Sequence, residues 1–471
     1  MSYITGLGGT PGAGWFTDNN GQPKLWVASE TWSLPANAGA WNGSGGGTWE
    51  QDFDNFFSQR AAQGLTVCMT DLVGNTEQGG SYNNGNTWDN VAPFNTGQDP
   101  ASGLNSTYWA RYDYMLNSAL AQGVTVALVF NQYDWATGCC YNGWTNAQCQ
   151  AYGAALGTRY KNQPNLIWLF GNDGYPGSLD IAWDYIITGL SGAGDTHLIG
   201  VWWSAEYTSR YETDNNTAAA FGEANSAFNF GYTYNAGYWV CEYAYSETLS
   251  PDDQAHLLPV IWGDGYFYQS GATNEYYDLD DRAMRQETWW WLTAGGRGIL
   301  SEAENVYPWA ATSPAAVTGD WFFVHNLPVI VSTYTGLGEW WKLLPDLTSS
   351  FVTAGRGTRV SGLTSGGGGG SYENSFTNSW VTASITPDGT LAVCYLPNHT
   401  TITVSRSMLA AGWTASWIDP ITGAVTPAGT SGTYNSTAKG TNSQGDPDWV
   451  LAFQGPAQLP SPAYTAFMAA M

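Results

Sequence analysis

The sequence predicts an α/β protein in which a (β/α)8 barrel is followed by a small all-β sandwich domain. Over the first ~345 residues, short apolar runs alternate with segments of helical periodicity, and this alternation predicts a parallel sheet surrounded by helices. Eight such runs occur, which is the number of strands that closes a barrel. Beyond them, turn residues recur about every ten positions, which is typical of a β-sandwich. We therefore assign residues 1–345 to the barrel and residues 346–471 to the sandwich.

Each predicted barrel strand is a short, mainly apolar run that ends at polar or glycine residues. The eight runs are Leu25–Ala28, Leu65–Thr70, Val124–Phe130, Leu166–Phe170, His197–Trp202, Ala227–Phe230, Leu258–Trp262 and Gly298–Ser301. Helical patterns lie between them and end near a Gly or an Asn-x-Pro, as helix stops do. These helices are Trp49–Gln63, Thr107–Gln122, Ala147–Asn162, Leu179–Leu190 and Asp280–Ala294, and Trp321–Leu344 is expected to be the closing helix.

The second domain is predicted from short β-type runs that turns separate. The runs are Phe351–Val360, Trp380–Thr386, Thr390–Tyr395, Thr400–Val404, Trp413–Ile418 and Trp449–Phe453. The glycine-rich stretch Ser361–Gly370 follows the first run, so we expect a flexible surface loop between early strands of this domain.

Composition narrows the class of partner. Hydrophobic residues make up 43% of the 471 residues and charged residues only 11%, which indicates a globular protein with a large core. The chain has 26 Trp and 28 Tyr, whose flat faces stack on the C–H faces of sugars, although many of them can simply be core residues. Its net charge of −25 argues against binding nucleic acid, anionic membranes or anionic substrates. A neutral glycan fits better.

Targeting and metal signals are weak. No apolar stretch reaches the length of a transmembrane helix, and the N-terminus lacks a charged segment followed by an apolar one, so we see no signal peptide. Cys139, Cys140 and Cys149 share one loop-like segment, so a local disulfide to Cys149 is one option, whereas Cys68 lies in an apolar strand and is expected to be a buried thiol. No cysteine spacing matches a zinc site and only four His occur, so we expect neither a transition metal nor a cofactor.

Two carboxylates follow predicted strands. The run Leu166–Phe170 leads into Gly171-Asn172-Asp173, and the run Leu258–Trp262 leads into Gly263-Asp264. Residues just past the carboxyl ends of barrel strands line the active site of (β/α)8 enzymes. Two carboxylates delivered there are the minimum equipment of a glycosidase.

Several motifs, taken in order, resemble one family, the apiosidase-like glycoside hydrolases. They are Gly21-Gln-Pro-Lys-Leu-Trp26 with Glu30-Thr-Trp32, Trp109-Ala-Arg-Tyr-Asp-Tyr114, Arg159-Tyr-Lys-Asn-Gln-Pro-Asn-Leu-Ile-Trp168 with Gly171-Asn-Asp173, Trp417-Ile-Asp-Pro-Ile-Thr-Gly-Ala-Val425 and Asp448-Trp-Val-Leu451. The third is the most specific, and the resemblance runs nearly from end to end. It implies a (β/α)8 catalytic domain followed by a small β-domain that is often labelled as collagen-binding.

The resemblance implies that Asp173 is the general acid/base, which requires a carboxyl group of raised pKa. Trp168, Phe170 and Tyr175 are expected to supply the desolvation that raises it. The alternative is that Asp173 only caps the helix that follows.

The resemblance places the nucleophile after the seventh strand, where the family pattern is Pro-Val-x-x-Gly-Glu. This chain has Pro259-Val-Ile-Trp-Gly-Asp264 instead, so the carboxylate is one methylene shorter. Three roles stay open for Asp264: a nucleophile in a retaining mechanism, a base in an inverting mechanism, or a vestige that only binds sugar.

Further polar and aromatic residues at strand ends are candidates for substrate binding, although solvated loop acids are the alternative for each. They are Glu30, Trp32, Asp71, Asn131, Asp134, Trp203, Glu206 and Glu302, with Asn172, Trp262 and Tyr266 beside the two carboxylates. Glu302 is also the reserve candidate for a catalytic carboxylate.

We therefore expect a glycoside hydrolase that acts on a neutral cell-surface or cell-wall polysaccharide, with a furanosidic bond suggested by the family precedent. The rival hypothesis is a non-catalytic glycan-binding tail protein of a bacteriophage, which would reach its glycan without an export signal. The Gly-, Asn- and Thr-rich, Lys-poor composition fits that interpretation. Either protein would work outside the cell or on a virion tail, and other tail proteins or further copies of the chain are candidate partners.

Overall fold

The computed structural model describes sixteen stretches of the chain. They are residues 1–10, 12–39, 48–73, 85–131, 143–171, 179–203, 207–209, 221–222, 224–233, 237–248, 258–264, 267–268, 278–279, 281–300, 325–359 and 379–456. Within these stretches, no helix combines the length and the apolar character that crossing a lipid bilayer requires.

Eight strands form the predicted barrel, which confirms the fold class. They are β4 (Trp26–Glu30), β5 (Val67–Asp71), β6 (Thr125–Asn131), β7 (Leu166–Gly171), β8 (Ile199–Trp202), β10 (Asn229–Tyr232), β11 (Val260–Asp264) and β14 (Gly298–Leu300). The sheet has the order β8-β7-β6-β5-β4-β14-β11-β10-β9, in which β9 (Tyr207–Thr208) is an added antiparallel strand on β10. Ala227 also donates its backbone N–H to the carbonyl of Ile199 at 2.8 Å, which joins the segment before β10 to β8.

Helices follow most of these strands, as a barrel of this class requires. The longer helices are α2 (Trp49–Ala62), α3 (Ser106–Gln122), α5 (Asn146–Tyr160), α6 (Leu179–Gly192), α8 (Gly237–Thr248), α9 (Asp281–Thr293) and α11 (Leu327–Gly336). Capping boxes start α2 and α5, where Thr48 pairs with Gln51 and Thr145 pairs with Gln148. Short helical turns are α1 (Leu34–Asn37), α13 (Ser436–Lys439) and the 3-10 turns at Pro100–Ser102, Trp340–Lys342 and Arg406–Met408.

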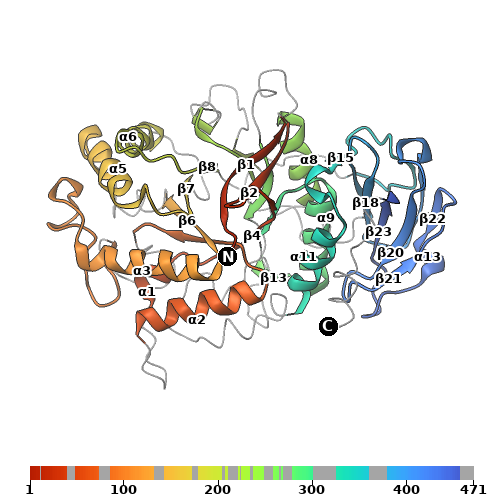
Figure 1. Ribbon diagram of the computed structural model, residues 1–471, viewed down its shortest axis with the longest axis horizontal. Coiled ribbons are helices and arrows are strands. Elements are labelled where there is room, and N and C mark those ends of the chain that lie inside the picture. The colour runs from red at the N-terminus through yellow and green to blue at the C-terminus, as the bar shows by residue number, and fades with distance from the viewer. Residues whose placement is uncertain are drawn as a thin grey trace. The chain divides into compact units, whose positions relative to one another are not determined.

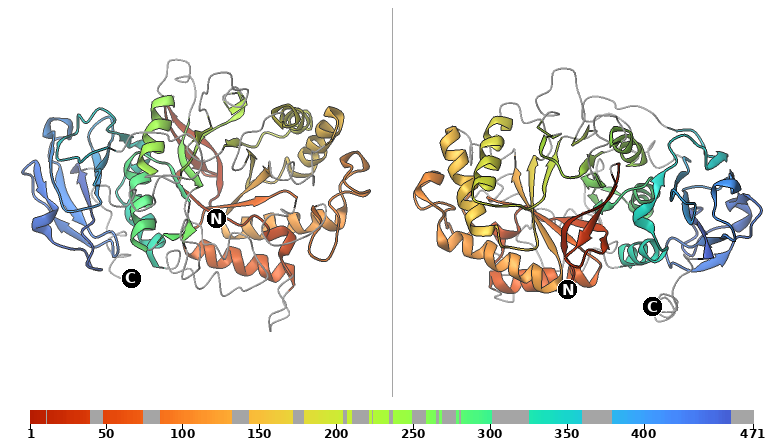
Figure 2. Two further views of the ribbon diagram at one scale, coloured as in Figure 1. Left: turned by 180° about the vertical axis from the view of Figure 1, so that it is seen from behind. Right: turned by 45° about the horizontal axis from the view of Figure 1, so that its top comes forward.

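Helices α5 and α6 pack side by side, as Figures 1 and 2 both show, and their backbones approach each other closely. The reason is a pair of facing glycines. A Cβ on Gly153 of α5 would lie 2.0 Å from the carbonyl oxygen of Ile186, and one on Gly189 of α6 would lie 2.2 Å from that of Gln150. Only glycine lets the two backbones approach this closely.

One element that the sequence analysis did not predict covers the amino-terminal end of the barrel. It is a small sheet of β1 (Ile4–Thr10), β2 (Ala13–Asp18) and β3 (Pro23–Lys24). Ile4 donates its backbone N–H to Oγ1 of Thr125, the first residue of β6, at 2.8 Å. Phe16 packs its ring 5.2 Å from Trp26 and 5.4 Å from Phe228. This small sheet therefore plugs the end of the barrel opposite the carboxyl ends of the strands.

The C-terminal region forms two antiparallel sheets, which confirms the predicted all-β domain. One sheet has the order β15-β17-β18-β23-β20-β21 and the other the order β16-β19-β22. Their strands are β15 (Leu344–Pro345), β16 (Val352–Ala354), β17 (Thr382–Ile385), β18 (Leu391–Leu396), β19 (Thr401–Val404), β20 (Thr414–Ile418), β21 (Val425–Pro427), β22 (Thr433–Asn435) and β23 (Trp449–Gln454). Side chains from both sheets share one core, in which Tyr434 packs 5.3 Å from Phe453.

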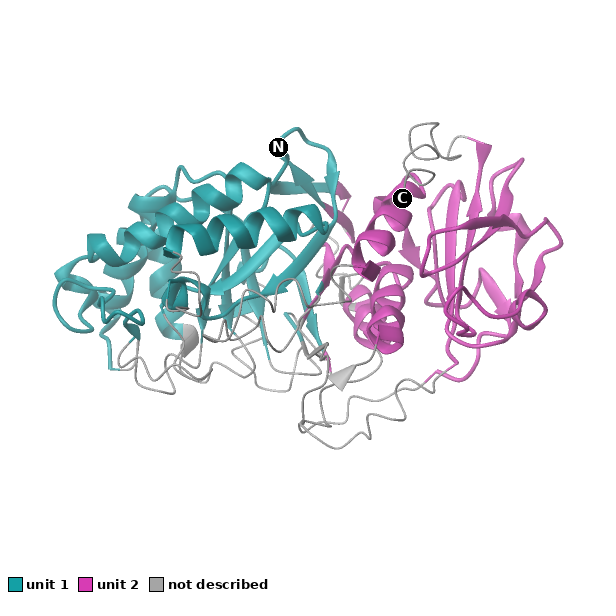
Figure 3. Ribbon diagram, turned by 90° about the horizontal axis from the view of Figure 1, so that it is seen from below, with its two compact units in different colours: residues 1–8, 16–232, 300–320 teal, residues 9–15, 233–299, 321–471 magenta. Residues whose placement is uncertain are grey.

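The chain divides into two compact units (Figure 3). Unit 1 comprises residues 1–8, 16–232 and 300–320, and unit 2 comprises residues 9–15, 233–299 and 321–471. Unit 2 thus joins α8 and α9 of the barrel with the C-terminal sheets. Trp290 of α9 donates its ring N–H to the carbonyl of Trp380 at 3.1 Å, and Ser384 of β17 donates to the carbonyl of Thr293 at 2.6 Å. The domain boundary between residues 345 and 346 stays a prediction.

Candidate active site

The candidate site residues fall into three groups. Glu30, Asp71, Asn131, Trp32, Trp203 and Trp262 lie in the described residues. Asp264 is the last residue of β11, but only its backbone is described. Asp134, Asn172, Asp173, Glu206, Tyr266 and Glu302 lie outside the described residues, as do Tyr175, Cys139 and Cys140.

Glu30, Asp71 and Asn131 are the last residues of β4, β5 and β6, and strand register places them on one face of the sheet. Glu30 is aligned with Met69, which precedes Asp71 by two residues. Asp71 is aligned with Val129, which precedes Asn131 by two residues. Because side chains alternate along a strand, residues two apart share a face. We call these three residues the polar floor.

The face that carries the polar floor is the barrel interior. Trp26 lies four residues before Glu30 on β4, so the two side chains point the same way. Its ring lies 5.3 Å from that of Phe228, just before β10, a strand that is not a neighbour of β4 in the sheet. Side chains of non-neighbouring strands meet only across the inside of a barrel.

Asp71 is held in place from two sides. The side-chain amide of Asn131 donates to Oδ1 of Asp71 at 3.0 Å, and the hydroxyl of Tyr112 donates to the backbone carbonyl of Asp71 at 2.9 Å. Burial raises the pKa of Tyr112 well above its usual value, so this hydroxyl stays a neutral donor. Glu30 is 1% exposed, and Asp71 and Asn131 are fully buried. The polar floor is thus buried, and its hydrogen bonds hold the carboxyl ends of β5 and β6 in place.

A column of aromatic rings stands beside the polar floor inside the barrel. Trp202, the last residue of β8, stacks on Trp32 at 5.1 Å and on Phe230 of β10 at 4.9 Å. Trp32 follows Glu30 by two residues, and its backbone carbonyl accepts from the N–H of Asp71 at 3.3 Å. These contacts place Trp32 at the carboxyl end of the strands, and the residue is only 2% exposed.

The other two predicted tryptophans pack against helices instead. Trp203 stacks on Trp183 of α6 at 6.1 Å and donates its ring N–H to the carbonyl of Ser209 at 3.1 Å. Trp262 of β11 lies nearly parallel to Trp291 of α9, with ring centres 6.1 Å apart. The position of Trp203 follows from strand alternation, since it directly follows Trp202, which points inward.

Gly171 ends β7 in a conformation and a space that only glycine can occupy. Its φ is +126°, and a Cβ there would lie 1.7 Å from the carbonyl oxygen of Trp202. Asn131 is aligned with Gly171, and Gly171 with Trp202. β7 therefore ends at the level of the polar floor, and Asn172 and Asp173 are the next two residues of the chain.

The two aromatic side chains on β7 before Gly171 point away from the interior of the barrel. Trp168 donates its ring N–H to Asp195 at 3.2 Å. The ring of Phe170 stacks on Phe130 at 4.4 Å and packs 6.0 Å from Trp183 of α6. Both side chains therefore point to the helix layer, because they alternate with the inward positions of β7. Neither side chain lies on the interior face of the barrel, and the surroundings of Asp173 stay a prediction.

A family comparison decides the class to which this barrel belongs. Residues 12–342 match the model of the family described as apiosidase-like, catalytic domain. The chain belongs to the apiosidase-like family. The match spans the barrel strands and all residues of the polar floor. No curated protein shows significant similarity to the chain.

Solved structures agree with this assignment at the level of the fold. A glycoside hydrolase of family 5 from Bacteroides vulgatus has a TM-score of 0.73 at 15% identity and covers 97% of this chain and 95% of its own. A second glycoside hydrolase has a TM-score of 0.69 at 16% identity and covers 97% of this chain and 99% of its own. The apiosidase-like chain thus has a glycoside hydrolase fold over nearly its whole length.

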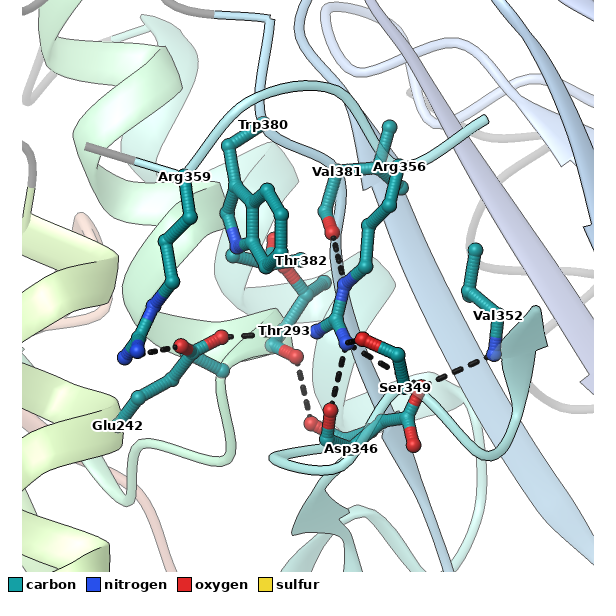
Figure 4. A network of polar contacts seen from close by, with 12 residues as sticks. Glu242, Thr293, Asp346, Ser349, Val352, Arg356, Arg359, Trp380, Val381 and Thr382 are labelled. Atoms are coloured by element: carbon teal, nitrogen blue, oxygen red, sulfur yellow. Dashed lines mark hydrogen bonds and ion pairs between the residues drawn. The ribbon is translucent and has the colours of Figure 1, made fainter. Parts of the chain in front are cut away.

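A second cluster of buried charge lies in unit 2 (Figure 4). Arg356 stacks its guanidinium 4.6 Å from the ring of Trp380 and donates to the backbone carbonyl of Asp346 at 2.6 Å. Glu242 of α8 is 3.5 Å from Arg356 and 2.8 Å from Arg359. Burial raises the pKa of Glu242, although both arginines pull it down. This cluster ties α8 to the C-terminal sheets, so we assign it a structural role.

The buried thiols are poor nucleophiles. Cys68 is a free, fully buried thiol, as predicted, and burial raises its pKa to about 12. Cys149 is also a free, buried thiol, and burial raises its pKa to about 11. A thiol that stays protonated at neutral pH is unreactive. Within the described stretches, no cluster of His, Cys, Asp or Glu has the makings of a metal site.

The sequence analysis missed two residues of the site. Tyr112 belongs to the motif Trp109–Tyr114, so a signal for it existed, but its hydroxyl contact with the carbonyl of Asp71 depends on the docking of α3 against β5. Trp202 ended a predicted strand, and its inward direction follows only once its register with Gly171 is known.

Proposed function

We propose that this chain is a glycoside hydrolase whose acid/base residue is Asp173 and whose second catalytic carboxylate is Asp264. The observation that carries the proposal is the polar floor: Glu30, Asp71 and Asn131 end three neighbouring strands on the interior face of the barrel. Active sites of (β/α)8 enzymes lie at this end. Membership of the apiosidase-like family supports the same class of reaction.

The exit of β7 supports the role of Asp173. This residue follows Gly171 by two positions, and Gly171 is aligned with Asn131 of the polar floor. The chain therefore emerges at the same end of the barrel and only two residues short of the carboxyl group. We propose that Asp173, in its protonated form, donates a proton to the glycosidic oxygen as the bond from that oxygen to the anomeric carbon breaks.

The role of Asp264 sets the stereochemistry. As a nucleophile about 5–5.5 Å from Asp173, the carboxylate of Asp264 would attack the anomeric carbon and form a covalent glycosyl ester. In the second step, the deprotonated Asp173 would take a proton from a water molecule, and this water would hydrolyse the ester. As a base about 6.5–9.5 Å away, it would instead deprotonate the water that attacks the anomeric carbon directly. The short side chain of Asp favours the second, inverting route.

One observation favours a second candidate, a glycan-binding protein without hydrolase activity. Trp262 precedes Asp264 by two residues and stacks on Trp291 of α9. Regular alternation would point Asp264 toward the same helix. A catalytic Asp264 thus requires an irregularity in the alternation of side chains along β11, such as a β-bulge at Gly263. Bulges of this kind are common beside active sites. Without that irregularity, the barrel would bind sugar through the remaining strand-end residues, as a phage tail adhesin would.

The substrate class follows from charge. With a net charge of −25, the chain repels anionic polymers, so we propose a neutral cell-surface or cell-wall polysaccharide. The family precedent suggests a furanosidic bond. Secreted and virion-borne forms both place the protein outside the cell.

Sugar release tests this proposal. Wild type and the Asp173→Asn variant are incubated with neutral cell-wall polysaccharides and with aryl furanosides, and released sugar is measured. We expect release by the wild type and a loss of about 10²–10⁴-fold in the variant. Equal release by both proteins would remove Asp173 from the mechanism, and release by neither would support the adhesin.

A further inference from the structure

The C-terminal sheets carry an open pocket far along the chain from the barrel strands. Its volume is about 360 Å³, and its lining residues are Arg406, Ser407, Gly412, Trp413 and Thr430. They come from three separate connections: the 3-10 turn at Arg406–Met408, the approach to β20, and the loop between β21 and β22. All three belong to unit 2.

Trp413 is a rigid, accessible platform in this pocket. It is half-buried and packs against the core of the two sheets, where its ring lies 5.9 Å from that of Phe453. Its backbone N–H is bonded to the carbonyl of Ala410 at 3.3 Å. An indole that is anchored on one side and open on the other offers a flat face for stacking at a small entropic cost.

Hydrogen-bond donors surround that platform. Arg406, Ser407 and Thr430 are exposed, so their guanidinium and hydroxyl groups can turn toward a ligand. The aliphatic part of Arg406 lies over Gly432, where an added Cβ would be 3.1 Å from Cδ of Arg406, and this packing limits where the guanidinium can go. A guanidinium fork and two hydroxyls match the vicinal hydroxyls of a sugar ring.

We propose that this pocket is a glycan-binding site that is separate from the barrel. A sugar of a neutral polysaccharide stacks its C–H face on Trp413 while Arg406 and Thr430 bond its hydroxyls. A second site would hold the polymer on the protein independently of any hydrolysis in the barrel. The proposal does not depend on catalysis, because it needs only an aromatic platform and the donors around it.

Affinity electrophoresis in gels that contain arabinogalactan, galactomannan or polygalacturonate tests the site. The parent protein in this test is the Asp173→Asn variant, and all further substitutions are made in it. The substitution keeps the polymer intact if Asp173 is catalytic and changes nothing if it is not. We expect retardation by a neutral polymer, and dissociation constants about tenfold higher in Trp413→Ala and several-fold higher in Arg406→Ala. Trp413→Tyr keeps an aromatic face and should restore most of the binding.

Trp341→Ala is the matched control, since Trp341 is another half-buried tryptophan of unit 2 that packs on Trp340 and lies outside the pocket. It should bind as the parent does. Thermal unfolding separates loss of binding from loss of fold in each variant. The proposal is overturned if Trp413→Ala folds and binds like the parent, if no neutral polymer retards the parent, or if only polygalacturonate does so.

Discussion

Two buried acids, Asp71 of unit 1 and Asp448 of unit 2, have different partners, and we use the difference to separate chemistry from structure. In unit 1, the carboxylate of Asp71 accepts from the neutral amide of Asn131 at the carboxyl end of the barrel strands. In unit 2, Asp448 accepts two bonds from the guanidinium of Arg285, at 3.0 and 3.1 Å. A guanidinium neutralises an acid and locks it, whereas an amide positions it and leaves its charge in place.

The same contrast explains why one motif of the C-terminal region is structural. Asp448 also accepts from the hydroxyl of Tyr395 at 3.0 Å and from the amide of Asn442 at 2.8 Å. Its side chain is fully buried, and Arg285 also reaches Asp446 at 2.7 Å. This network fastens α9 to the C-terminal sheets, and the carboxylate of Asp448 accepts from Arg285, Tyr395 and Asn442 at once, so it has no capacity for a substrate.

The largest effect is expected from breaking the arginine-held network. The variant Arg285→Met leaves Asp448 buried without its cation, which should cost about 3–5 kcal/mol of the free energy of unfolding. Denaturant titration measures the change. Lys342→Ala is the control, because Lys342 pairs with Glu339 at the surface and such pairs contribute at most about 1 kcal/mol. Equal losses in both variants would refute the structural assignment.

A second variant tests the exit of β7. Gly171→Ala forces a Cβ against the carbonyl of Trp202 and a positive φ on an L residue, which together should cost at least about 1–3 kcal/mol. Sugar release should fall with it, because the backbone that delivers Asp173 must move. Gly192→Ala on α6 has open space around its Cβ and should be neutral or slightly stabilising. Unfolding and activity of both variants are compared.

A third variant tests the polar floor. Asn131→Ala removes the amide that donates to Asp71, which should cost about 1–3 kcal/mol because a buried acceptor loses its partner. Turnover should fall as well, while Asn86→Ala, which loses only an exposed bond to Asn90, should change neither quantity by much. Full activity in Asn131→Ala would separate the polar floor from function.

The smallest effect concerns pH. Burial raises the folded-state pKa of Glu242 above its ordinary value of 4.5, so the folded protein binds this proton more tightly than the unfolded chain does. Stability from this group is therefore present below pH 4.5 and is lost as the pH rises from there through the folded-state pKa. Melting temperatures of wild type and Glu242→Gln, measured from pH 4 to pH 8, should converge or cross, with the wild type declining more. If the melting temperatures of the two proteins change with pH in parallel, the folded-state pKa of Glu242 is not raised.

The barrel could be predicted because each of its strands is a continuous apolar run. All eight predicted strands occur within two residues of the expected positions. The helix α8 was missed because Gly237–Thr248 mixes aromatic and polar residues around its whole circumference, and even its more exposed face carries the aromatic residues Trp239 and Tyr243. The sheet of β1 to β3 was missed because its glycine-rich strands carry little hydrophobic periodicity.

The sequence predicted which residue types lie at the strand ends better than it predicted which way their side chains point. Strand ends located Glu30, Asp71 and Asn131, since apolar runs stop where polar residues begin. The direction of each tryptophan depended on register, so Trp203 and Trp262 could not be told apart from Trp202 in advance. Asp173, Asn172, Asp134, Glu206, Tyr266 and Glu302 keep the status of predictions.

A paired measurement on Asp173→Asn and Asp448→Asn tests the central claim most directly. Both variants exchange one acid for its isosteric amide, and both are assayed for sugar release and for melting temperature. We predict that Asp173→Asn loses activity by at least about 10²-fold with little change in melting temperature. For Asp448→Asn we predict a lower melting temperature as the main effect. Unchanged sugar release in Asp173→Asn, or an unchanged melting temperature in Asp448→Asn, would contradict the division between a catalytic acid in the barrel and a structural acid in unit 2.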